Sequence, residues 1–207
     1  MNAQAAVRPY DEVLDAQKQY RTLLQCTARP GTIGQFDDFE LEIPPQLNRA
    51  TALLAFTLFS SDSSFYLEQG ADKAGDYLRH RTMARQVPAE LADFLLITDP
   101  GRLEPLGLAR VGTLSYPDLG STVVVQVTAI SPAPMMDSFR LTLNGPGIET
   151  EAVVFVLGAP EALFESLRER NAEFPLGIDA YLTCDSLSAG PCVLALPRTT
   201  RVHWERV

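Results

Sequence analysis

Short runs of apolar and β-branched residues constrain the fold of this chain more than any other feature. Three of them, residues 94–97, 123–127 and 153–157, are almost continuously apolar. Such a run suits a strand that is buried on both faces, because a strand with one solvated face alternates instead. Residues 139–143 do alternate, which predicts a strand with one wetter face. Two further apolar runs, 178–184 and 192–196, complete the predicted sheet.

Two segments near the N-terminus have helical spacing. Between Pro9 and Ala28, apolar residues recur every three or four positions, so we expect one stripe to face the core, made of Val13, Ala16, Tyr20, Leu23, Leu24 and Thr27. Pro30 and Gly31 should end this helix. A second helix is predicted from Asn48 to Phe59. It is apolar on nearly every side, so it should lie in the core or beneath a partner.

A third predicted helix, Glu161 to Asn171, lies between the runs at 153–157 and 178–184. The order strand, helix, strand is typical of a βαβ unit, which predicts that these two strands pair in parallel. A chain of 207 residues has the length of one domain. We therefore expect a single α/β domain over residues 1–207, with a mixed and mostly buried sheet that helices flank.

The charge of the chain excludes several classes of partner. The net charge is −9 and there is no basic cluster, which argues against nucleic acid and against anionic membranes. The most apolar stretch, residues 50–59, is far shorter than a membrane-spanning helix. Three cysteines cannot form a fully paired disulfide framework, and the first residues lack a secretory signal. These features predict a cytoplasmic protein.

The common catalytic and metal-binding motifs are missing. The sequence has no Walker loop, no GxGxxG and no GxSxG. Its two histidines, His80 and His203, cannot build a His-rich metal site. Cys184 and Cys192 flank a loop, but no histidine lies at zinc spacing, so we interpret them as small buried side chains. No metal is predicted.

Five turn segments rich in Gly, Pro, Arg and hydroxyl residues remain: 28–32, 112–122, 143–148, 174–179 and 195–200. Each also has a structural explanation, since Gly and Pro form tight turns and an Asp can cap its own backbone. The side chains in these segments that could bind an anion or a partner are Arg29, Tyr116, Asp118, Arg198, Thr199 and Thr200.

Arg198 is the strongest of these candidates. Pro197 ends the preceding strand, which places residues 198–200 at the carboxyl end of that strand. Ligands usually bind at the carboxyl ends of strands in open α/β sheets. A guanidinium there could hold a phosphoryl group or a partner carboxylate through two parallel hydrogen bonds. Alternatively, Arg198 pairs with an acidic residue of its own chain and stabilises the turn. The sequence leaves both interpretations open.

Taken in order, segments 28–32, 112–122, 145–148, 174–179 and 196–200 resemble the H subunits (PhnH) of the bacterial carbon–phosphorus lyase system. Residues 60–85 and the extreme C-terminus carry no part of this resemblance. It implies a homodimeric subunit of a core complex with three other subunit types. That complex displaces adenine from a nucleoside triphosphate with a phosphonate, before the carbon–phosphorus bond is cleaved. It further implies a shortened relative of the pyridoxal-phosphate transferase fold that does not retain the cofactor.

The sequence supports the absence of that cofactor, which would need a lysine near its ring. Only Lys18 and Lys73 are present. Lys18 lies on the outer part of the N-terminal helix, and residues 70–75 around Lys73 are predicted to form an exposed loop. We expect no cofactor and a non-catalytic, accessory role.

The competing hypothesis is a stand-alone phosphate-ester transferase that uses Arg198 and Thr199. The expectation of a homodimer has support in the helix at 50–59, which has more apolar surface than packing against one sheet would bury. We therefore expect this helix, or an edge strand, near a two-fold axis.

Overall fold

Seven strands form the larger of two sheets in the computed structural model, which describes residues 8–186 and 190–207. Strands β9, β5, β4, β2 and β3 run parallel to one another, whereas β10 and β1 run antiparallel to their neighbours. The order across the sheet is β1 (Ile33–Gln35), β10 (Gly190–Leu196), β9 (Asp179–Ser186), β5 (Thr122–Gln126), β4 (Phe94–Ile97), β2 (Ser64–Leu67) and β3 (Arg85–Gln86). The predicted α/β fold with a large mixed sheet is confirmed.

The second sheet is antiparallel throughout. Its order is β11 (Arg201–Arg206), β7 (Phe139–Asn144), β8 (Ala152–Leu157) and β6 (Ala129–Ser131). The predicted βαβ unit is therefore wrong, because β8 lies in the small sheet and β9 lies in the large one. The helix between them, α4 (Glu161–Arg170), crosses from one sheet to the other. The sequence analysis also missed β11, so β10 is not the last strand.

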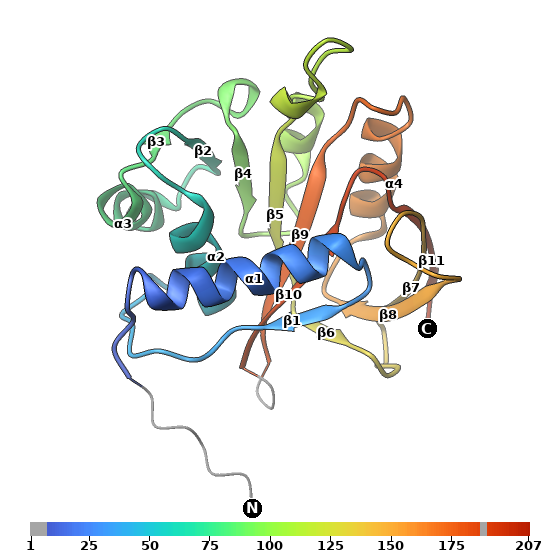
Figure 1. The fold of residues 1–207 in the computed structure, drawn as a ribbon, viewed down its shortest axis with the longest axis horizontal. Helices are drawn as coiled ribbons and strands as arrows, with labels where there is room; N and C mark the ends of the chain where they lie inside the picture. Colours follow the sequence, from blue (N-terminus) through green and yellow to red (C-terminus); the bar gives the residue numbers. More distant parts are fainter. Residues whose placement is uncertain (1–7, 187–189) are drawn as a thin grey trace, which may run out of the picture.

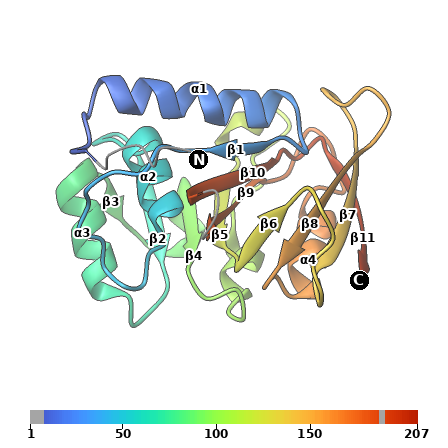
Figure 2. The same ribbon diagram turned by 90° about the horizontal axis from the view of Figure 1, so that it is seen from below.

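The large sheet is buried on both faces, as its continuous apolar runs predict (Figures 1 and 2). Helices α1 (Leu14–Ala28), α2 (Arg49–Leu58) and α3 (Asp72–Thr82) cover one face. Leu96 and Val124 point into that layer. Their neighbours Leu95, Val123 and Val125 point the other way, into an apolar cluster shared with the small sheet and α4. The alternating directions explain why nearly every residue of the runs at 94–97 and 123–127 is apolar.

Helix α2 is buried inside its own chain. Ala50 to Ala55 are all buried, and α1 and α3 pack against the helix. The Asn48 side chain accepts a hydrogen bond from the Thr51 N–H at 2.7 Å, and the carboxylate of Asp185 accepts from the next two N–H groups, those of Arg49 and Ala50. Both acceptors satisfy donors that a helix start leaves free. The apolar surface of this helix, which we expected near a dimer axis, is thus buried by contacts within the chain.

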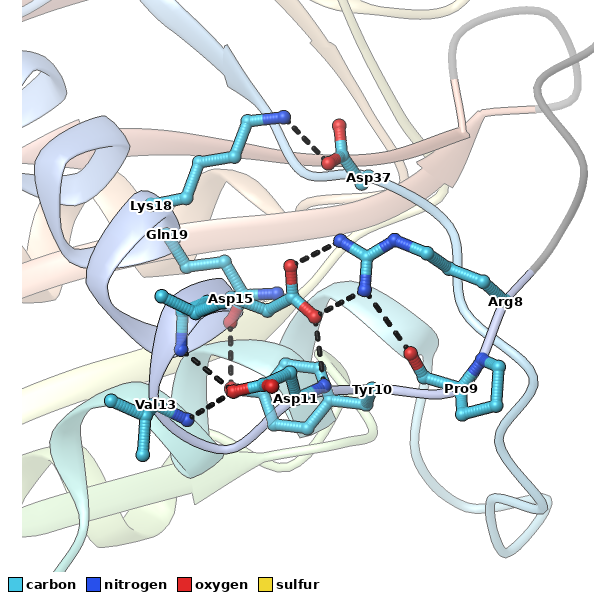
Figure 3. A network of polar contacts seen from close by, with 10 residues as sticks. Arg8, Pro9, Tyr10, Asp11, Val13, Asp15, Lys18, Gln19 and Asp37 are labelled. Atoms are coloured by element: carbon cyan, nitrogen blue, oxygen red, sulfur yellow. Dashed lines mark hydrogen bonds and ion pairs between the residues drawn. The ribbon is translucent and has the colours of Figure 1, made fainter.

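Helix α1 buries a different face from the one that its apolar spacing predicts. Asp15, Gln19, Leu23 and Cys26 face inward, whereas four apolar side chains are exposed, namely Val13, Leu14, Tyr20 and Leu24. Figure 3 shows part of the reason, namely the contacts that Arg8 and Tyr10 make with Asp15 and Gln19. The Arg8 guanidinium donates two hydrogen bonds to Asp15, one of them at 2.7 Å, and the Gln19 carbonyl accepts from the Tyr10 and Thr57 hydroxyls. Buried polar groups are tolerated when they are paired in this way, and of these two side chains only the Gln19 amide nitrogen lacks a hydrogen-bond partner among the described atoms.

The same region sets where α1 begins. The Asp11 carboxylate accepts hydrogen bonds from the N–H groups of Val13 and Leu14, at 2.9 and 2.8 Å. These bonds satisfy the first donors of the helix, so it starts at Leu14 and not at Pro9.

Residues 60–85, which carried no resemblance, form β2 and α3. Lys73 lies in the first turn of α3, so the predicted loop at 70–75 is only partly correct. Within residues 8–186 and 190–207, no helix combines the length and the apolar character that crossing a membrane requires.

Candidate functional site

The turn segments singled out in the sequence come together along one side of the fold. Glycine is required where they meet. Gly147 has a φ of +85°, and a Cβ at this position would clash with the carbonyl oxygen of Ala28. Gly145 has a φ of +140°, and a Cβ there would lie 2.8 Å from the carbonyl oxygen of Thr199. The segments at 28–32, 143–148 and 195–200 are therefore in direct contact.

Arg198 joins two more of these segments. Its backbone N–H and Nη2 donate to the two carboxylate oxygens of Asp179, at 2.8 and 2.7 Å, and its Nη1 donates to the carbonyl oxygen of Pro117 at 2.7 Å. The arginine thereby links the end of β10 to the start of β9 and to the 3-10 turn η3 (Pro117–Leu119). The structure thus shows the pairing with an acidic residue of its own chain that the second interpretation expects, while a role of Arg198 toward a ligand or partner stays a prediction.

Arg198 follows the carboxyl end of β10 as predicted, but β10 is not one of the parallel strands of the sheet. Because β10 runs antiparallel to β9, the end of β10 lies beside the start of β9. Arg198 therefore lies at the amino ends of the parallel strands, and the general rule for ligand sites concerns their carboxyl ends.

A second arginine–aspartate pair lies at the same edge of the sheet. Asp93, just before β4, pairs with Arg110 and accepts a hydrogen bond from the Ser64 hydroxyl at 2.7 Å. Burial raises the pKa of Asp93, but the hydrogen bonds from Ser64 and Arg110 outweigh burial and hold it below its usual value. Carboxylates that precede or begin parallel strands thus hold arginines from neighbouring segments, which is a structural role.

The carboxyl ends of β4 and β5 border a cavity of about 430 Å³. Several polar groups in and beside this cavity are paired with one another, although the Gln46 side-chain oxygen is buried without a hydrogen-bond partner among the described atoms. The Gln126 amide donates to the carbonyl oxygens of Gln46 and Thr98, at 2.8 and 3.3 Å, and the Asn48 amide donates to that of Thr183 at 3.1 Å. These bonds hold the start of α2 against the sheet.

The other predicted site residues fall into two groups. Thr199 and Thr200 follow Arg198, while Tyr116 and Asp118 flank Pro117 and are exposed. The fold brings these four residues to one region, because Arg198 bonds to Pro117. Arg29 is exposed at the end of α1. Among the described residues, no hydrogen bond or ion pair joins Arg29 to Arg198.

A cavity of about 690 Å³ opens next to Arg198. It lies between the second half of α4, the loop that follows α4, and the connection from β10 to β11. Arg198, Thr199 and Thr200 line it, together with several residues that the sequence analysis did not select: Phe164, Leu167, Arg168, Asn171, Phe174, Arg201 and Val202. No local signal in the sequence relates α4 to residues 198–202, since only the tertiary fold places them together.

Cys184 and Cys192 face each other across β9 and β10, with their sulfur atoms 3.3 Å apart. Both are buried in the apolar cluster beneath the small sheet. The hydrogen bond between them and their burial raise the pKa of the Cys184 thiol. In the part of the chain that the structure describes, no group of three or more His, Cys, Asp or Glu residues could hold a metal ion.

Comparison with known proteins identifies the family of the chain. A family model described as "Bacterial phosphonate metabolism protein (PhnH)" matches residues 9–203. The chain is 31% identical to the "Alpha-D-ribose 1-methylphosphonate 5-triphosphate synthase subunit PhnH" of Rhizobium meliloti (strain 1021), over 94% of each chain. It is 30% identical to the "Putative C-P lyase subunit protein HtxG" of Stutzerimonas stutzeri, over 90% of this chain and 85% of the relative. The chain therefore belongs to the PhnH family of bacterial phosphonate metabolism proteins.

Proposed function

We propose that the protein is an accessory, non-catalytic subunit of the carbon–phosphorus lyase core complex. In this role it assists the transfer of the ribose triphosphate moiety of a nucleoside triphosphate onto a phosphonate, ahead of carbon–phosphorus bond cleavage. The observation that carries the proposal is similarity over almost the whole chain to a protein named as a subunit of such a synthase. Because nucleoside triphosphates are cytoplasmic substrates, we place this activity in the cytoplasm.

The chemistry of the described residues supports a role in assembly. Displacing adenine requires groups that activate a nucleophile or protonate a leaving group. The two histidines, His80 at the end of α3 and His203 on β11, are exposed and lie on different elements. The Arg198 guanidinium already donates to Asp179 and Pro117, which makes it a poor anion site for a stand-alone transferase.

We propose two kinds of partner, a second copy of this chain and the other subunits of the complex. The exposed apolar side chains of α1 support the first, because Val13, Leu14, Tyr20 and Leu24 belong to one helix that lies on the outside of the molecule. Exposed apolar patches usually mark interfaces. The region around Arg198, with the exposed Tyr116 and Asp118, is then available to a different subunit.

Co-expression with the neighbouring subunits tests the proposal. We expect a tagged copy of this chain to co-purify with them in a defined stoichiometry, and we expect the chain alone to sediment as a dimer of twice 22.7 kDa. Leu24→Glu should shift the isolated chain to a monomer, whereas Leu114→Glu, an exposed residue away from α1, should not. Turnover of a nucleotide and a phosphonate by the isolated chain would instead establish the transferase alternative.

We also propose that residues 1–207 form one H-subunit-like domain related to the pyridoxal-phosphate transferases but without their cofactor. The residues do not fit that cofactor, because Lys18 is exposed on α1 and pairs with Asp37 at 2.6 Å, while Lys73 is exposed on α3. Neither lysine follows a strand of the sheet, where an aldimine would form. We expect no new absorbance band when the protein is incubated with the cofactor. A lysine adduct trapped by borohydride would contradict this.

A further inference from the structure

The cavity beside α4 is positively charged in a protein that carries a net charge of −9. Its lining includes three arginines, Arg168, Arg198 and Arg201, and no Asp or Glu. Arg198 is neutralised by Asp179. Arg168 stacks over the Trp204 ring at 4.9 Å and Arg201 is exposed. Within the described ranges, neither of these two arginines has an acidic partner. Two arginines of the lining therefore carry a positive charge that no ion pair neutralises in the described residues.

The rest of the cavity is mainly apolar. Phe164, Leu167 and Leu196 are buried in its floor, and Val202 is partly buried beside them. At its rim, the Phe174 side chain is 71% exposed. Burying such a ring stabilises a complex, because apolar surface leaves water. A volume of about 690 Å³ lies within the usual range for small-molecule sites.

One polar group in this wall has no partner in its own chain. Thr200 is 8% exposed, and among the described atoms its Oγ1 is buried without a hydrogen-bond partner. Leaving a buried hydroxyl unpaired costs free energy, so a ligand group that reached Thr200 Oγ1 would gain a hydrogen bond there.

We propose that this cavity binds an organic anion, namely an apolar group that carries a phosphonate, phosphate or carboxylate head. The head contacts Arg168 and Arg201, both of which can donate paired hydrogen bonds to any of these groups. The apolar group lies against Phe164, Leu167 and Phe174. Arg198 holds the wall in place through Asp179. This assignment does not depend on the proposed function.

Calorimetric titration of the purified chain tests the assignment with four probes, which are benzylphosphonate, phenylacetate, inorganic phosphate and benzyl alcohol. We expect benzylphosphonate to bind saturably and at least about tenfold more tightly than inorganic phosphate, which lacks the apolar group, or benzyl alcohol, which lacks the charge. Comparing benzylphosphonate with phenylacetate identifies the preferred head group. Saturation by none of the probes, or equal affinity for inorganic phosphate and benzylphosphonate, would overturn the proposal.

Variants locate the site. Arg201→Gln and Arg168→Gln should each weaken benzylphosphonate binding roughly tenfold, since each removes a charge-assisted hydrogen bond. Phe174→Ala should weaken the binding of benzylphosphonate but leave the binding of inorganic phosphate unchanged.

The matched control is Arg85→Gln, which makes the same charge change on β3 at the far edge of the large sheet. An equal loss in Arg85→Gln and Arg201→Gln would show a general charge effect and refute the site. Because Arg201 is exposed, its variant should keep the melting temperature of the natural protein. If none of these ligands binds, co-purification with other subunits can still be observed, so the binding proposal and the proposed function are tested separately.

Discussion

Two arginine–aspartate pairs stabilise opposite parts of this molecule, and they differ in which partner is buried. At the N-terminus, the Arg8 side chain is 51% exposed while that of Asp15 is 3% exposed. At the edge of the large sheet, the Arg198 side chain is 14% exposed while that of Asp179 is 35% exposed. The Arg8 guanidinium makes two hydrogen bonds to Asp15, whereas Arg198 donates to Asp179 from its backbone N–H, its Nε and its Nη2.

Which partner is buried affects how many segments of the chain each pair connects. Arg8 and Asp15 are seven residues apart, so their pair holds one N-terminal segment against the start of one helix. Arg198 bonds to Asp179 and also to Pro117, which is 81 residues away along the chain. A buried arginine has five donors to distribute, whereas a buried carboxylate only accepts. Arg198 therefore connects three segments by hydrogen bonds, whereas the Arg8 side chain makes its hydrogen bonds near the N-terminus and reaches a further segment by stacking over the Phe39 ring at 5.0 Å.

Replacing Arg198 should have the largest effect. In Arg198→Lys the charge remains, but the planar donor group that reaches Asp179 and Pro117 is lost. We expect a loss of about 2 kcal/mol of unfolding free energy, which lowers the melting temperature by several degrees. Arg29→Lys, at an exposed position, serves as the control. An Arg198→Lys protein that melts normally but fails to join the complex would show that Arg198 binds a ligand or a partner.

Replacing Arg8 should have a smaller effect that depends on pH. The hydrogen bonds from Arg8 hold the pKa of Asp15 below its usual value, even though burial raises it. A carboxylate with a lowered pKa stabilises the fold above its ordinary pKa, and this contribution is lost as the pH falls through the lowered value. Arg8→Gln should therefore melt below the natural protein at pH 7, and the difference should shrink below about pH 4. A difference that stays constant from pH 7 to pH 3 would contradict this account.

The exposed pair of Lys18 with Asp37 should matter least. Both side chains are largely solvated, and such pairs contribute little because water and salt screen them. We expect Lys18→Gln to change the free energy of unfolding by less than about 0.5 kcal/mol. A larger loss, measured by urea denaturation, would mean that the exposure of the side chains does not predict how much each of the three ion pairs stabilises the fold.

The buried strands could be predicted because their chemistry is local. The runs at 94–97 and 139–143 correspond closely to β4 and β7, since residues buried on both faces must all be apolar and residues at a wet face must alternate. The sheet to which a strand belongs is not a local property. The strands β8 and β9 both contain apolar runs, and only the packing of the whole chain assigns them to different sheets.

Helix α1 shows a second limit of sequence patterns. Its spacing places Val13, Tyr20 and Leu24 on one stripe, but the helix buries Asp15 and Gln19 because Arg8, Tyr10 and Thr57 supply their hydrogen-bond partners. Those partners come from other segments, so the sequence of the helix alone does not reveal them. The apolar stripe left outside is itself informative, because it marks the face that we assign to a second copy.

The candidate site was located in part. The sequence selected Arg198, Thr199 and Thr200 from their place after a buried strand, and these three residues line the cavity of about 690 Å³ beside α4. It did not select Arg168 or Arg201, because an arginine on a helix or an edge strand is ordinarily solvent-exposed. These two arginines become candidates for ligand binding only because, among the described residues, the wall of the same cavity contains no carboxylate.

The edge strands of the two sheets affect whether the protein aggregates at high concentration. Unpaired strand edges can add strands from other molecules and so nucleate aggregates. The edges of the large sheet are β1 and β3, which are only three and two residues long, too short to template an incoming strand. The longer edge of the small sheet, β11, carries Arg201, Glu205 and Arg206, and charged side chains discourage such addition. The fold should therefore tolerate the crowding that the proposed assembly with other subunits would entail, and contacts between copies should form through side chains and not through shared strands.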